Sequence, residues 1–186
     1  MRLFIALELP DAVRRQLATL SGGLPGMHWT PSENYHLTLR FLGETDRQAA
    51  DDIDAMLAGV HAPAFSLTLQ GIDCFAAGNR IRTLWAGTSR EPGLQHLRDK
   101  IESACVRSGL APDGHRFTPH VSLGRARDPL PRSKLQEYLV QHGLFKTQPF
   151  AVTEFTLFAS MLGGTHAVYR VLRRYSLVQR PAEVHL

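Results

Sequence analysis

Two four-residue segments that nearly repeat each other place the strongest constraint on how this chain can fold. Residues 36–39 read His-Leu-Thr-Leu, and residues 120–123 read His-Val-Ser-Leu. Successive side chains of a β-strand point to opposite faces, so the histidine and the hydroxyl of each segment share one face. The aliphatic residues share the other face. Each segment therefore predicts a strand with one polar face and one face in the core.

The repeat is improbable as a coincidence. The chain has 9 histidines, 22 serines and threonines, and 26 leucines in 186 residues. This composition gives an expected number of about 0.15 chance matches to His-x-Ser/Thr-Leu. The two motif histidines, His36 and His120, are separated by about half the chain. One motif in each half predicts two similar lobes, each contributing one strand to a shared cleft.

Hydrophobic patterning predicts strands and helices in a mixed order, as in an α+β fold. Strands are expected over residues 2–9, 34–42, 64–70, 81–87, 116–124, 150–158 and 167–178, with a hairpin at Gly163-Gly164. Helices are expected over residues 11–20, 47–58, from 92 up to Gly109, and over 132–142. Asp11 and Asp46 are the expected caps of the first two helices. The segment with Pro25 and Gly26 is an expected loop, and Trp85 is expected in the core.

Length and composition narrow the class of protein. A chain of 186 residues forms one domain, or two small lobes that share a core. Its net charge of +4 favours an anionic ligand. No apolar run approaches the roughly 20 residues that a membrane helix needs, and the N-terminus reads as a strand and not as a signal peptide. Cys74 and Cys105 have neither metal spacing nor a disulfide pattern, which suits a reducing, cytoplasmic location.

Two histidines and two hydroxyls are the minimum needed for acid–base chemistry on a phosphate. The pKa of histidine, roughly 6.5, lets one imidazole act as a neutral base while the other acts as a charged acid. Thr38 and Ser122 would donate hydrogen bonds to the non-bridging phosphate oxygens. Zinc needs three or four ligands, and neither motif has a carboxylate or cysteine at ligand spacing. We therefore expect phosphodiester cleavage with no metal and no cofactor.

Longer blocks of the sequence resemble a known family. They are the opening RLFIA (residues 2–6), HLTLRFLGE (36–44), LWAG (84–87) and FTPHVSLGR (117–125). In this order they resemble the two-histidine (2H) phosphoesterase superfamily, and within it the bacterial and archaeal RNA 2′,3′-cyclic phosphodiesterases, also called 2′-5′ RNA ligases. The last 60 residues match only loosely. Ser122 departs from the threonine more frequent in the family; it keeps the hydroxyl and loses the methyl group.

The resemblance implies a fold and an activity. The fold would be a single domain, residues 1–186, of two pseudo-symmetric lobes, with antiparallel sheets lining a central basic cleft and helices outside. The activity would be hydrolysis of an RNA terminal 2′,3′-cyclic phosphate to a 2′-phosphate, with possible reversible 2′-5′ RNA ligation. His120 would be the general base that activates water, and His36 the general acid that protonates the departing 3′ oxygen. The partner would be RNA with a cyclic phosphate end, tRNA-like fragments included, and the protein a cytoplasmic monomer.

The resemblance adds two candidate substrate-binding residues. Phe4 lies where the family has an aromatic residue that stacks on a base, although the first strand could equally bury it in the core. Arg125 lies where the family contacts phosphate. Simple alternation from His120 would turn Arg125 to the opposite face, unless Gly124 bends the strand.

Arg40 presents the opposite case. Its position in the strand gives it the same parity as His36 and Thr38, so alternation favours the cleft. The family resemblance gives it no role there, and arginines near strand ends are commonly solvated.

Two alternative functions are left open by the sequence. The first is a phosphodiesterase for a small cyclic nucleotide, such as an ADP-ribose cyclic phosphate. A wider basic surface beside the cleft would favour RNA over such a substrate. The second is a non-catalytic RNA-binding module, which the four intact motif residues disfavour.

Overall fold

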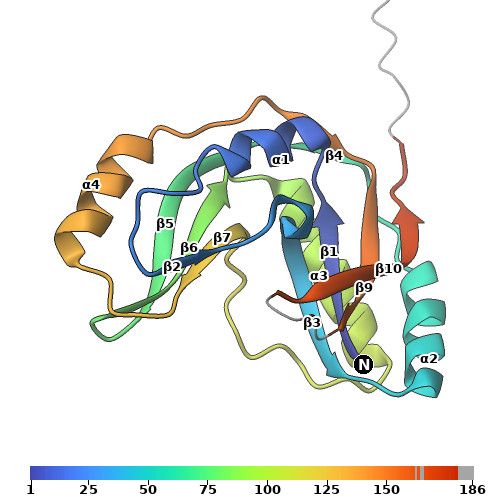
Figure 1. The fold of residues 1–186 in the computed structure, drawn as a ribbon. Helices are drawn as coiled ribbons and strands as arrows, with labels where there is room; N and C mark the ends of the chain where they lie inside the picture. The colour runs from blue at the N-terminus through green and yellow to red at the C-terminus, as the bar shows by residue number, and fades with distance from the viewer. Residues whose placement is uncertain (162, 164–165, 180–186) are drawn as a thin grey trace, which may run out of the picture.

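The computed structural model describes residues 1–161, 163 and 166–179 of the chain. Its elements confirm the α+β class (Figure 1). In chain order they are β1 (Arg2–Glu8), α1 (Asp11–Ala18), β2 (Met27–Trp29), the 3₁₀ turn η1 (Ser32–Asn34), β3 (His36–Glu44), α2 (Arg47–Ala58), β4 (Phe65–Leu67), β5 (Leu69–Ala77), β6 (Arg80–Thr88), α3 (Pro92–Arg107), β7 (His120–Ala126), α4 (Arg132–His142), β8 (Phe150–Val152), β9 (Glu154–Met161) and β10 (Val168–Ser176).

One antiparallel sheet carries both motif strands, in the order β10-β9-β1-β3-β7-β6-β5. We call β10, β9, β1 and β3 the first lobe, and β7, β6, β5 and the short β2 the second lobe. The lobes meet where β3 pairs with β7 through Leu37 and Val121. Further along, β2 takes the place of β3 at the same edge of β7. The two motif strands therefore touch at their motifs and then diverge. The lobes are not the two halves of the chain, because β9 and β10 join the first lobe and β2, β5 and β6 join the second.

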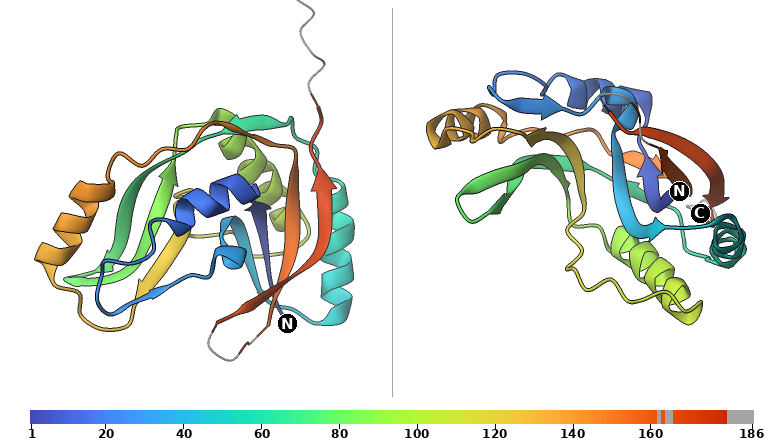
Figure 2. Two further views of the ribbon diagram at one scale, coloured as in Figure 1. Left: turned by 45° about the horizontal axis from the view of Figure 1, so that its top comes forward. Right: turned by 60° about the horizontal axis from the view of Figure 1, so that its bottom comes forward.

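The core lies on one face of this sheet. Leu3, Ile5 and Leu7 of β1 belong to a cluster that also includes Leu97 and Ile101 of α3. The apolar residues of the other helices join the same cluster, and α2 and α4 lie at opposite ends of the molecule (Figure 2). The opposite face of the first lobe holds only a small buried cluster of Phe4, Ala6 and Phe158. This second face is the one that carries the motif histidines, and we call it the cleft face.

The expected helices agree with the structure, apart from one cap. The predicted ranges 47–58 and 132–142 are those of α2 and α4. Asp46 caps α2 as expected, because its carboxylate accepts a hydrogen bond of 2.8 Å from the backbone N–H of Ala49. The expected cap at Asp11 is wrong: Pro10 is the cap residue, and Asp11 is the first helical residue, paired with Arg14.

Two expected strands are each divided in two. Residues 64–70 form β4 and the start of β5, which belong to different sheets, because β4 pairs with β8 and β5 with β6. Residues 150–158 likewise form β8 and the start of β9. The expected loop around Pro25 contains the short strand β2. The expected turn at Gly163-Gly164 includes a position outside the described residues.

In the described part of the chain, no helix is both long and apolar enough to span a membrane.

Candidate active site

The two motif histidines are oriented by the same local contact. His36 Nδ1 lies 2.7 Å from the carbonyl oxygen of Asn34, and His120 Nδ1 lies 2.7 Å from the carbonyl oxygen of Thr118. A carbonyl oxygen only accepts hydrogen bonds, so Nδ1 of each ring carries the proton. Nε2 of each neutral imidazole is therefore left to accept or, once protonated, to donate a proton.

The pairing of β3 with β7 places the two motifs side by side in one sheet. Leu37 and Val121 are direct partners, and both are fully buried. Continuing this antiparallel register by one residue each way sets His36 opposite Ser122, and Thr38 opposite His120. The four polar side chains are half-buried and share the cleft face. The prediction of one motif strand from each lobe is confirmed, and the strands are direct neighbours.

Aromatic rings surround both imidazoles. The ring centroid of His36 lies 4.9 Å from that of Phe4 and 5.1 Å from the Tyr169 ring, which it meets edge-on. The centroid of His120 lies 4.9 Å from that of Phe75, also edge-on, and 5.7 Å from that of Trp85.

These surroundings disfavour the charged form of both histidines. Burial lowers the pKa of His36 and of His120, and their hydrogen bonds to backbone carbonyls oppose this only partly. The charge of His120 lowers the pKa of His36 further, so the two rings are close enough for their protonation to be coupled.

A β-bulge decides where Arg125 points. On the β6 side of β7, Ser122 pairs with Trp85 and Gly124 pairs with Leu84, so Leu123 is an extra residue. The extra residue reverses the alternation, and Arg125 lies on the same face as Ser122, exposed to solvent. The bend expected at Gly124 is present as a bulge one residue earlier.

Gly124 has a different role, which is close packing. A Cβ atom at this position would lie 2.8 Å from the carbonyl oxygen of His28 and 3.1 Å from Cγ of Met27, both in β2. The glycine therefore lets β2 pair against the bulged part of β7.

A matching bulge in β3 turns Arg40 away from the face of His36. Thr38 pairs with Ala6 and Arg40 pairs with Ile5 of β1, so Leu39 is the extra residue. Arg40 consequently shares the face of Ile5, which is fully buried in the core. The expectation that alternation brings Arg40 beside His36 is wrong for this reason.

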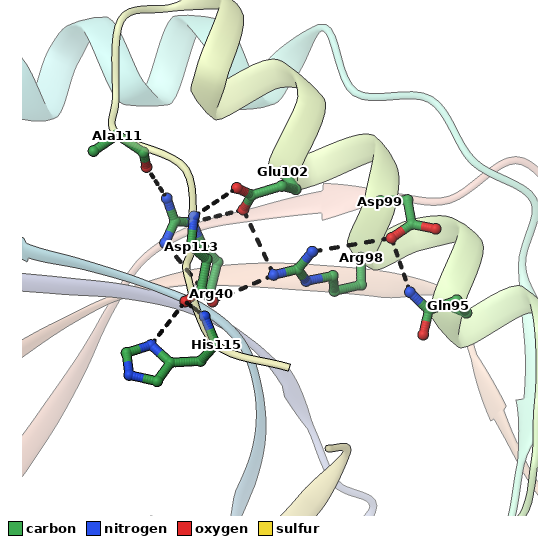
Figure 3. A network of polar contacts seen from close by, with 8 residues as sticks. All are labelled: Arg40, Gln95, Arg98, Asp99, Glu102, Ala111, Asp113 and His115. Atoms are coloured by element: carbon green, nitrogen blue, oxygen red, sulfur yellow. Dashed lines mark hydrogen bonds and ion pairs between the residues drawn. The ribbon is translucent and has the colours of Figure 1, made fainter. Parts of the chain in front are cut away.

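On the core face, Arg40 joins a network of polar contacts with α3 and the segment that follows it (Figure 3). Its Nε lies 2.9 Å from a carboxylate oxygen of Glu102, and its Nη2 donates to the carbonyl of Ala111 at 2.5 Å. Arg98 contacts Asp113 at 3.3 Å, and the N–H of Asp113 donates to Glu102. The network therefore fixes the segment that leads from α3 to His120.

Phe4 follows the buried alternative, and Trp85 differs from its expected place. Phe4 faces the cleft side but is only 3% exposed, since it stacks on Phe158 and contacts the ring of His36. It supports the histidine and has no open face on which a base could stack. Trp85 is not in the main core: it pairs with Ser122 and its ring contacts Phe75 and His120.

Phe41 is a cleft residue that was not predicted from the sequence. The bulge that turns Arg40 inward turns Phe41 outward, and it is 68% exposed. It lines a groove of about 700 Å³ together with Thr38, Phe75 and His120. The other lining residues are Leu39, Arg40 and Leu42 of β3 and residues of the segment 110–118, which the Arg40 network holds at the wall of the groove. Strict alternation would bury Phe41, so no pattern in the sequence reveals this position without the bulge.

Comparison with known proteins agrees with this geometry. The family model of the 2'-5' RNA ligase superfamily matches residues 9–162, a span that includes both motifs. The chain belongs to the 2'-5' RNA ligase superfamily. Among superfamily relatives, the "RNA 2',3'-cyclic phosphodiesterase" of Thermotoga maritima is 30% identical over 178 residues, covering 92% of this chain and 93% of the relative. That of Escherichia coli is 30% identical over 191 residues, covering 96% and 97%.

Solved structures of the superfamily share the fold. The crystal structure of Escherichia coli LigT complexed with 3'-AMP superposes with a TM-score of 0.75 at 30% identity, covering 96% of this chain and 98% of that one. A protein of Thermus thermophilus superposes with a TM-score of 0.78 at 28% identity, covering 95% and 97%. The family expected from the motifs is confirmed.

Proposed function

We propose that this protein hydrolyses the 2′,3′-cyclic phosphate at the end of an RNA to a 2′-phosphate. The observation that carries the proposal is the pairing of two motif strands, each presenting an imidazole whose Nδ1 is bound to a carbonyl and whose Nε2 is available. The relatives named as RNA 2',3'-cyclic phosphodiesterases support the choice of substrate. We infer further that both lobes act as one catalytic domain, because each supplies one histidine and one hydroxyl.

In the proposed reaction, His120 Nε2 takes a proton from water, and the water oxygen forms a bond to phosphorus. The bond between phosphorus and the 3′ oxygen breaks on the opposite side. His36 Nε2 gives its proton to that oxygen, which leaves a 3′ hydroxyl and a 2′-phosphate. Each proton transfer typically contributes about 10²–10⁴-fold to the rate. With a 5′ hydroxyl in place of water as the nucleophile, the same two roles would form a 2′-5′ linkage, a property of the superfamily, and their reversal would cleave that linkage.

The neighbouring residues would stabilise the charge that grows on phosphate. Thr38 and Ser122 would each donate a hydroxyl hydrogen bond to a non-bridging oxygen. The Arg125 guanidinium, on the same face as Ser122, would contact the phosphate in the geometry that arginine favours. Phe41 would offer its exposed ring to the nucleoside in the adjoining groove. The 3'-AMP complex of Escherichia coli LigT supports a nucleotide as the occupant.

The reaction needs no metal ion in this proposal. Each histidine has one ring nitrogen left for the cleft, so the pair offers two ligands where zinc sites use three or four. Within the described residues, no three His, Cys, Asp or Glu side chains form a group that could hold a metal.

The decisive experiment is incubation with an oligoribonucleotide that ends in a 2′,3′-cyclic phosphate, followed by chromatography of the product against both phosphate isomers. We expect the 2′-phosphate. Exclusive formation of the 3′-phosphate would mean that the ring binds in the opposite orientation and that His36 does not serve the leaving group. Tight binding of the folded protein without turnover would instead favour the RNA-binding module.

Three expectations from the sequence stay predictions: the monomeric state, the cytoplasmic location and tRNA-like fragments as substrates.

A further inference from the structure

The second lobe carries a group of arginines beyond the reacting residues. Arg125 and Arg127 follow Ser122 in and just beyond β7, and Arg80 begins the neighbouring strand β6. All three are exposed. Nη2 of Arg80 donates a 3.0 Å hydrogen bond to the carbonyl oxygen of Arg127, so these two residues are in contact.

Strand geometry places Arg125 and Arg80 on the cleft face. Arg125 reaches that face through the bulge at Leu123, and Ala126 packs against the main core. Arg127 lies one residue beyond β7, and its carbonyl oxygen accepts the hydrogen bond from Arg80. In β6, Thr83 pairs with Phe75 and Ile81 with Ala76, so Arg82 is an extra residue. Ile81 packs on the core, which leaves Arg80 on the cleft face.

The arginines of this group differ in their partners from those on the cleft face of the first lobe. On that face, Glu8 binds Arg174 through two contacts of 2.8 and 3.0 Å, and Glu44 binds Arg2 at 2.7 Å. The ion pairs recorded among the described residues include none with Arg80, Arg125 or Arg127. A group of positive side chains with no carboxylate among its recorded ion partners raises the local positive potential, so this surface favours an anionic ligand.

The spacing suits a polyanion better than a single phosphate. A strand rises about 3.3 Å per residue, so the backbones of Arg125, in β7, and Arg127, one residue beyond its end, are at most about 7 Å apart. Long guanidinium side chains at that spacing can reach successive phosphates of one backbone. The group also begins three residues after Ser122 and leads away from the two histidines.

We propose that Arg127 and Arg80 extend the site from Arg125 as a phosphate track, which binds the backbone of the nucleotides that precede the cyclic end. This inference rests on the proposed function and sharpens it: the preferred substrate is a single-stranded oligoribonucleotide and not a mononucleotide. The nucleotides that precede the cyclic end lie along the second lobe, because the arginines on the cleft face of the first lobe are already paired with carboxylates.

The test compares kcat/KM for a hexanucleotide ending in a 2′,3′-cyclic phosphate with kcat/KM for a nucleoside 2′,3′-cyclic phosphate. In R80Q/R127Q, we expect the ratio of the two values to fall by about 5- to 10-fold, the size of two exposed charge contacts. The dependence of log kcat/KM on log salt concentration for the hexanucleotide should become shallower by about 1.4, or roughly 0.7 for each lost contact to a single strand.

Two further variants serve as controls. R47Q/K100Q removes the same charge from exposed positions on α2 and α3, and it should leave the ratio unchanged. R80K/R127K keeps the charges, so its ratio of the two kcat/KM values should stay close to that of the unaltered protein.

An unchanged ratio and an unchanged salt slope in R80Q/R127Q would overturn the track while leaving the proposed function intact. An equal loss in R47Q/K100Q would also overturn it, because it would show a response to net charge alone. If the unaltered protein turned over neither substrate, the proposed function would fail instead. The track would then be decided by the salt dependence of binding of a fluorescent hexanucleotide.

Discussion

Replacement of Arg40 separates a role in the fold from a role in the cleft. The Arg40 side chain is 10% exposed, and its partner Glu102 is 17% exposed, at 2.9 Å. Removing one partner of a buried ion pair typically costs about 3–5 kcal/mol. Here both groups keep some contact with water, and Arg98 remains 3.8 Å from Glu102. We therefore expect R40M to lower the free energy of unfolding by about 2–3 kcal/mol.

Urea and thermal unfolding measure this loss directly. For a chain of this length, 1 kcal/mol corresponds to roughly 2–4 °C in Tm, so the expected decrease is roughly 5–10 °C. R2M is the matched control, because Arg2 and Glu44 form an exposed pair that solvent screens, so its Tm should change little. The double variant R40M/E102Q should recover part of the loss, since it removes the unpaired charge but keeps an acceptor for the N–H of Asp113.

The activity of R40M distinguishes a role in the fold from a role in substrate binding. Below the Tm of R40M, its kcat/KM for a cyclic phosphate should fall less than tenfold, because the side chain lies on the core face. A large loss of kcat/KM with unchanged unfolding would refute this reasoning and place Arg40 against the substrate.

Four further predictions concern the site. H36A and H120A should each lower kcat by about 10²-fold or more while RNA binding persists, which turnover and anisotropy measurements would separate. The pH dependence of kcat/KM should be bell-shaped with its maximum below about 6.5, because burial lowers the pKa of both imidazoles. The same shifts affect stability. The free energy of unfolding should decrease as the pH falls below about 6.5, since the unfolded chain then binds more protons than the folded state. Turnover should be unaffected by EDTA, and a loss that zinc or manganese restores would contradict the metal-free reaction. G124A should be less stable and should bind RNA more weakly. The new Cβ would meet the carbonyl of His28 at 2.8 Å and displace β2 from the part of β7 that carries Arg125. A variant indistinguishable from the unaltered protein in Tm and KM would argue against that packing.

The sequence predicted the parts of the site that depend on simple alternation. His36, Thr38, His120 and Ser122 lie within three residues of one another in their strands, and the buried residues between them fix the face. The ends of α2 were predictable for a similar reason, since Asp46 supplies a local hydrogen bond to the first turn. Such features depend on contacts within a few residues.

The predictions from the sequence are wrong where the pairing between strands interrupts the alternation of side chains. Leu39 and Leu123 are both apolar, and a bulge leaves two consecutive residues on the core side in each strand. The pattern of residues 36–42 would satisfy a regular strand equally well, so the sequence contains no sign of the bulge. The division of residues 64–70 has the same origin, because the two halves pair with different partner strands.

The two bulges also explain how a nearly symmetric site can act on an asymmetric substrate. An antiparallel pair has a local two-fold axis, which at Leu37 and Val121 relates His36 to His120 and one bulge to the other. The same operation relates Phe41 to Arg125, and there the symmetry ends, because one lobe exposes an aromatic ring and the other a guanidinium. A nucleotide with a cyclic phosphate also has a flat apolar end and a charged end. We therefore expect Phe41 and Arg125, each five residues beyond a motif histidine, to decide the orientation of the cyclic phosphate and with it which histidine acts as acid and which as base.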